Sequence, residues 1–146
     1  STARGSVENV LCAVGDITGV DFGEYEVRFN IPGGLPTDGP SAGIAIAIAL
    51  YSAVNGRAPL PLTAATGEVT IHGEVRPVGR VREKLEAALG AGAVRVLIPL
   101  ENDDAEFAAQ PAVCPVSTLE EAFAIAFDEK VSQEKHDVVT ITVCTN

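Results

Sequence analysis

Apolar residues recur with helical spacing in several stretches of the chain, and each of these stretches predicts a helix. Apolar positions three and four residues apart predict a first helix over 3–14, which Gly15-Asp16 and Gly19 should break. The stretch 42–55 carries no charged residue. A helix over 41–54 should therefore be central and buried on most sides. Shorter helices are expected over 81–89, from Asn102 or Asp103 to 110, and from a capping box at Ser117 or Thr118 to 127.

Other stretches alternate polar and apolar residues, which is typical of a strand with one buried face. The stretch 25–31 shows this alternation. Residues 65–71 and 74–78 predict two strands joined by a hairpin at His72-Gly73. Further strands are expected over 94–99, over 112–116 and, without an identified partner, over 138–143. Because strands and helices alternate, we expect an α/β fold, a single compact domain in which helices pack on a mixed sheet.

The composition favours one cytoplasmic domain. A chain of 146 residues can bury a real core, and with 47% hydrophobic and only 5% aromatic residues that core must consist of Val, Ile, Leu and Ala. The net charge of −10 argues against nucleic acid and membrane surfaces as partners. Three cysteines without a CxxC pair indicate a reducing compartment. No signal peptide is recognisable, and no apolar run is long enough to span a bilayer.

The loop 32–41 is the first candidate for chemistry. Its glycines and prolines should give it a defined shape, and it delivers Ser41 to the first turn of the apolar helix. A hydroxyl at that place can cap the helix or act as a nucleophile. Asp38 offers an alternative cap, and a loop this constrained is more than a cap requires. Both interpretations of Ser41 remain open at this point.

A nucleophilic serine needs a base, and the histidines are poor candidates for it. His72 lies at the tip of the predicted hairpin and His136 in a polar tail. Among the three lysines, Lys84 lies at the border of the apolar face of its helix. A lysine there can lose its water and become the neutral amine that a base requires, or it can extend its ammonium to solvent. Helix geometry alone does not separate these alternatives.

Two other kinds of site have weaker support. The run from Gly34 to Ser41 resembles a phosphate-binding loop in its spacing, so a phosphate- or nucleotide-binding domain is the alternative function. Pro40 stands where such a loop needs lysine, however, and Asp38 would repel phosphate. The acidic run 101–104 is more typical of a helix start than of a calcium loop, and Cys114 is expected in the core. No metal or cofactor is therefore expected.

Two long motifs resemble the proteolytic domain of the Lon protease family. The first is Pro36-Thr-Asp-Gly-Pro-Ser-Ala-Gly43, and the second runs from Gly67 through Lys84 to Ala88. The resemblance extends over residues 5–127 and includes Glu101-Asn102. The loop 29–34 is most similar to the bacterial sporulation-type branch.

This resemblance implies an ATP-dependent endopeptidase that cleaves unfolded or misfolded polypeptides with a Ser-Lys dyad and assembles as a hexameric ring. Carried over by position, Ser41 is the nucleophile and Lys84 its general base. Thr66 matches the threonine that orients the lysine, and Asp38 matches an acidic position that shapes the loop. ATP and magnesium belong to the family's ATPase module, and the proteolytic domain itself uses no cofactor.

The chain also departs from the family pattern. Family members carry strands before the proteolytic motifs and an ATPase module, and neither is recognisable here. We therefore expect residues 1–130 to form a Lon-like proteolytic domain without its N-terminal strands, followed by an extension of unknown role over 131–146. Self-association should be weak in such a fragment. An inactive scaffold that only forms rings is a third hypothesis.

Overall fold

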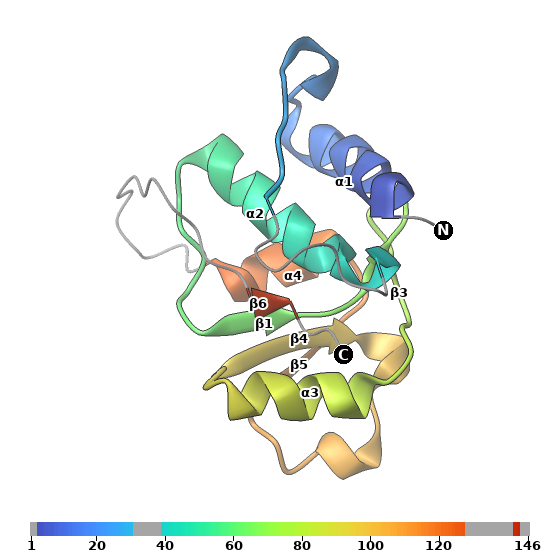
Figure 1. Ribbon diagram of the computed structural model, residues 1–146, viewed down its shortest axis with the longest axis vertical. Coiled ribbons are helices and arrows are strands. Elements are labelled where there is room, and N and C mark those ends of the chain that lie inside the picture. Colours follow the sequence, from blue (N-terminus) through green and yellow to red (C-terminus); the bar gives the residue numbers. More distant parts are fainter. Residues whose placement is uncertain (1–2, 31–38, 128–141, 144–146) are drawn as a thin grey trace.

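A parallel four-stranded sheet lies at the middle of the fold, and helices cover both of its faces (Figure 1). The computed structural model describes residues 3–30, 39–127 and 142–143. The predicted α/β fold is confirmed, although the main sheet is parallel throughout and a separate antiparallel hairpin supplies the mixed character. In spatial order the strands are β5 (Val113–Val116), β4 (Arg95–Pro99), β1 (Thr63–Ala65) and β6 (Thr142–Val143).

The two faces of the sheet bury different sets of side chains, because successive residues of a strand point to opposite sides. Ala64 pairs with Val96 in register, and both belong to a small core beneath α3 (Val81–Gly90). The next pair, Ala65 and Leu97, belongs to the larger core on the opposite face. The sheet thus separates α3 from the other helices, as Figure 1 shows.

The apolar helix α2 (Gly43–Asn55) is the centre of the larger core. It packs against α1 (Ala3–Thr18), against α4 (Leu119–Ala126) and against β1, and most of its residues are buried. A short 3-10 turn, η2 (Gly39–Ala42), precedes it, and Gly56 ends it in the left-handed conformation with φ 63°. The prediction of a central helix buried on most sides is confirmed.

The chain leaves the parallel sheet after β1 and forms a short hairpin from β2 (Glu68–Val69) and β3 (Val75–Arg76). The hairpin is bonded to the start of α4, because Val75 N–H donates to Ser117 O at 2.9 Å and Leu119 N–H donates to Gly73 O at 2.9 Å. The predicted hairpin is confirmed. The single strand expected over 65–71 is wrong, because the chain passes from one sheet to the other between Ala65 and Glu68.

Helix boundaries follow the sequence signals with two exceptions. Thr118 caps α4 as expected, its hydroxyl accepting the Glu121 N–H at 3.2 Å. The first helix does not end at Gly15-Asp16 but continues to Thr18, where Gly19 adopts φ 77°. The brief helix expected up to residue 110 is replaced by two 3-10 turns, η3 (Leu100–Asn102) and η4 (Ala105–Phe107). Asp104, rather than Asn102 or Asp103, caps the second turn.

The remaining strand predictions have mixed outcomes. The structure assigns no strand to residues 25–30, which follow a 3-10 turn, η1 (Phe22–Glu24). Val27 and Phe29 nevertheless pack against the larger core, which explains the alternation of polar and apolar residues. The strand expected over 138–143 appears at 142–143 as β6, paired with β1. The rest of that stretch lies outside the described residues, as does the proposed boundary at 130.

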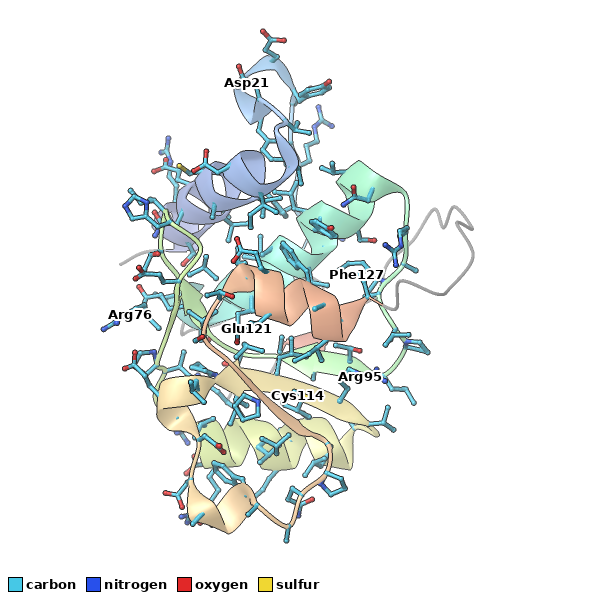
Figure 2. The ribbon with its side chains drawn as sticks, turned by 180° about the vertical axis from the view of Figure 1, so that it is seen from behind. Asp21, Arg76, Arg95, Cys114, Glu121 and Phe127 are labelled. Atoms are coloured by element: carbon cyan, nitrogen blue, oxygen red, sulfur yellow. The ribbon has the colours of Figure 1, made fainter. Side chains whose placement is uncertain are left out.

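The cysteines offer a test of burial. Cys12 is exposed, whereas Cys114 is half-buried on β5 (Figure 2), and burial raises the pKa of the Cys114 thiol above its ordinary value. Because the thiolate is the reactive form, iodoacetamide near pH 8 should modify Cys12 well before Cys114, and raising the pH should narrow the difference. Mass spectrometry of the digested protein measures both sites. Equal rates in the folded protein, matching those in urea, would contradict the burial of Cys114.

Candidate active site

Three of the predicted site residues lie on segments at the carboxyl ends of the parallel strands. Thr66 directly follows β1 and therefore lies at this edge. Helix α2 leads back toward the start of β1, and α3 leads back toward the start of β4, so both helices begin at the same edge (Figure 1). Ser41 precedes α2, and Lys84 lies in the first turns of α3. Ligand sites of parallel α/β sheets lie outside this edge.

Ser41 is held beside Thr66 by the backbone. Gly67 N–H donates to Ser41 O at 2.9 Å, and Ile44 N–H donates to Gly67 O at 3.2 Å. These bonds dock the start of α2 onto the turn that follows β1. The Ser41 side chain is fully buried. Ala42, rather than Ser41, occupies the cap position of α2, so the alternative role of Ser41 as the cap of that helix is wrong.

Gly43 permits this close docking. A Cβ atom at this position would lie 2.9 Å from the backbone nitrogen of Val69 and 3.0 Å from the carbonyl oxygen of Gly67. Both atoms belong to the backbone and cannot turn aside as a flexible side chain could. The glycine is therefore required by the approach of two backbones, as in other close contacts that only glycine allows.

Lys84 is the largest side chain in the described part of the chain that is completely buried, with 0% exposure. The neighbouring Glu83 and Glu86 are exposed on the outer face of α3. The hypothesis that Lys84 extends its ammonium into solvent is therefore wrong. Complete burial of a lysine is rare in proteins and costly for an ammonium, so it marks a candidate functional group.

Thr66 is also completely buried, and its backbone N–H donates to Leu97 O at 3.0 Å. Its hydroxyl oxygen has no hydrogen-bond partner among the described residues. A buried polar atom in this condition costs about 1–3 kcal/mol and calls for a functional explanation. Asp38 and the loop 32–38 lie outside the described residues, so the structure does not test the role expected for them.

The other candidates do not join this group. His72 is exposed at the hairpin tip, and His136 lies outside the described residues. Within the described ranges, no three His, Cys, Asp or Glu side chains are placed to hold a metal ion, and no helix is long and apolar enough to cross a membrane.

Arg82 forms a forked ion pair with Glu106, with N–O distances down to 2.8 Å. The hydrogen bonds and the charge of Glu106 raise the pKa of Arg82 above its ordinary value.

Sequence reasoning missed the structural role of one residue that contacts the segment before α3. Asn102 was considered as a helix cap and as part of the motif Glu101-Asn102, but its side chain binds the backbone of Val78, ahead of α3. No periodicity or composition signal indicates such a contact, because it joins segments that are distant in the sequence. Its place in the motif Glu101-Asn102 was the only available signal.

Comparison with known proteins identifies the family of this arrangement. Residues 8–132 match the model of the Lon protease (S16) C-terminal proteolytic domain. The chain belongs to the Lon protease family. It is 46% identical to Lon protease 2 of Bacillus subtilis over 106 residues, which are 72% of the chain and 19% of that protein. It is 36% identical to the Lon protease of Koribacter versatilis over 127 residues, which are 82% of the chain and 16% of that protein.

The Lon relatives confirm the family predicted from the motifs and indicate a peptidase. A third relative, the Lon protease of Methanosarcina barkeri, is 40% identical over 115 residues, which are 74% of the chain and 14% of that protein. The chain thus spans less than a fifth of the length of these curated relatives. The roles of Ser41, Lys84, Thr66 and Asp38 stay predictions.

Gly43→Ala should destabilise the protein, because the added Cβ separates α2 from the turn after β1. Overpacking of this kind costs about 1–3 kcal/mol. Gly90→Ala is the matched control, since no atom lies within 4 Å of the added Cβ and the site is in helix α3. The control should be neutral or stabilising by up to about 1 kcal/mol. Urea unfolding measures both, and equal free energies of unfolding for the two variants would contradict the tight docking at Gly43.

Proposed function

We propose that this chain is the proteolytic domain of a Lon-type serine peptidase, in which Ser41 is the nucleophile and Lys84 is the general base. The observation that carries the proposal is the complete burial of Lys84 at the sheet edge where α2 begins after Ser41. A lysine can act as a base only as a neutral amine, and removal from water is a general means of favouring that form. Membership of the Lon family supports the same assignment.

The chemistry follows in two stages. Ser41 Oγ attacks the carbonyl carbon of the scissile peptide while Lys84 Nζ takes the hydroxyl proton. Lys84 then returns this proton to the departing amine, which leaves an ester on Ser41. In the second stage Lys84 takes a proton from water, the hydroxide attacks the ester, and the proton returns to Ser41 Oγ as the carboxylic acid leaves.

The oxyanion must be held by N–H groups near the loop and the start of α2. The N–H of Ile44 is bonded to Gly67 O, and Pro40 has none. Neither residue therefore supplies an oxyanion donor in this arrangement. The donors belong to other residues around Ser41.

Thr66 is proposed to orient the base. Its buried hydroxyl oxygen lacks a partner among the described residues and can accept a hydrogen bond from the Lys84 amine. Such a bond would hold the nitrogen lone pair toward Ser41. Asp38 is proposed to shape the loop ahead of Ser41.

The activity of the whole protein is a further part of the proposal. Because the relatives are several times longer than this chain, we place ATP and magnesium in an ATPase module outside it and no cofactor in residues 1–130. Substrates are unfolded polypeptides, and the full protein is a cytoplasmic hexamer. The charge of −10 supports neither nucleic acid nor a membrane as partner.

A serine-directed fluorophosphonate tests the dyad without requiring ATP. The probe should label Ser41, and Ser41→Ala should remove the label. Lys84→Arg should also prevent labelling, because a guanidinium stays charged. Lys84→Met keeps a similar volume without a charge and should be equally unreactive, which covers a failure of the arginine variant to fold. Normal labelling of either lysine variant, or nucleotide-dependent stabilisation of an unlabelled wild type, would contradict the peptidase assignment.

Thr66→Val should slow labelling of Ser41, because it removes the hydroxyl that is proposed to orient Lys84 during the reaction. It should not lower the free energy of unfolding, because this hydroxyl has no partner among the described residues of the resting structure. Thr63→Val is the matched control at the other end of β1. The Thr63 hydroxyl donates to Leu60 O at 2.7 Å and accepts from Arg95 at 3.1 Å. The control should lower stability by about 1 kcal/mol and leave labelling unchanged. Unchanged labelling of the Thr66 variant would remove Thr66 from the site.

A further inference from the structure

Asn102 binds the backbone of Val78 in both directions. Its Nδ2 donates to Val78 O at 2.9 Å, and its Oδ1 accepts from Val78 N–H at 2.9 Å. The side-chain amide thereby satisfies both polar groups of one residue, as a neighbouring strand would. Asn102 lies at the end of η3, directly after β4, and is half-buried. The contact joins the central sheet to the segment that leads into α3.

A second contact lies beside this one. Arg76 Nη1 lies 3.4 Å from Glu101 Oε1, with side chains that are 52% and 56% exposed. Figure 2 shows Arg76 directed outward from the hairpin. An exposed pair of this kind contributes little to stability. The amide of Asn102, rather than this ion pair, is therefore the specific restraint on the segment.

The restraint reaches Lys84 through a short path in the backbone. Helix α3 begins at Val81, after Arg80 in the left-handed conformation with φ 59°. Lys84 N–H donates to Arg80 O at 3.1 Å. Fixing Val78 thus fixes where α3 starts and how far along the sheet edge Lys84 lies.

We propose that Asn102 is a positioning residue for Lys84, acting through Val78 and the start of α3. This inference rests on the proposed function, because it assigns Asn102 to the base of that site. Asn102 does not contact substrate in this scheme. A misplacement of the reacting groups by about 1 Å can reduce a rate by up to about 100-fold, so a modest shift of α3 is sufficient.

The test compares two variants of Asn102 with a neighbouring control. Asn102→Ala removes both bonds to Val78 and should lower the rate constant for fluorophosphonate labelling of Ser41 by about tenfold or more. Asn102→Asp keeps the acceptor for Val78 N–H but places a carboxylate oxygen against Val78 O, and these two acceptors repel each other, so its rate should fall at least as far as that of the alanine variant. Glu101→Gln removes only the exposed ion pair and should label at the wild-type rate.

The readout separates positioning from simple loss of stability. Rate constants are measured over a range of pH on protein shown to be folded by circular dichroism, at a temperature well below the unfolding midpoint of each variant. A displaced base changes the rate constant and its pH dependence, whereas a structural role reduces only the amount of reactive protein. If the alanine variant does not fold, the same labelling measurement is made on Asn102→Asp.

The outcomes distinguish this inference from the function on which it rests. Wild-type labelling with reduced rate constants in the Asn102 variants supports the positioning role. Wild-type labelling with unchanged rate constants in the folded Asn102 variants overturns it and leaves the peptidase intact. A wild type that is not labelled at Ser41 overturns the peptidase and the positioning role together.

Discussion

The docking of α2 onto the turn after β1 is the constraint on which the rest of the site depends. It consists of two backbone hydrogen bonds between the segment 41–44 and Gly67, and Gly43 provides the space for it. The same turn carries Thr66. The backbone of Ser41 is therefore fixed by main-chain bonds, while Ala42 occupies the cap position of α2.

Local signals in the sequence were enough to predict most helices. The capping box at Thr118 and the uncharged run of α2 depend on neighbours in the sequence, and both predictions are confirmed. Strand predictions were less successful, because a strand depends on a partner elsewhere in the chain. Polar and apolar residues alternate over 25–30 because Val27 and Phe29 pack on the core, although no strand is assigned there.

The site shows the same division between local and non-local information. Periodicity placed Lys84 at the border of a helix face but could not decide between solvent and core. That decision depends on how closely α3 packs on the sheet, and the structure gives 0% exposure. The motifs supplied Ser41 and Thr66 before any geometry was known. The contact of Asn102 with Val78 could not be predicted, because an asparagine offers the same donors and acceptors to a helix cap as to a distant backbone.

The bonds between the hairpin and α4 have a consequence for the order of folding. The hairpin separates the turn after β1 from α3, and it is held by Ser117 and Leu119, which are made long after Ser41 and Lys84. A ribosome synthesises the chain from its amino terminus, so these anchors emerge late. Until they do, the hairpin lacks these two backbone bonds. The hairpin between the segments that carry Ser41 and Lys84 therefore reaches its final anchoring only after residue 119 has been synthesised.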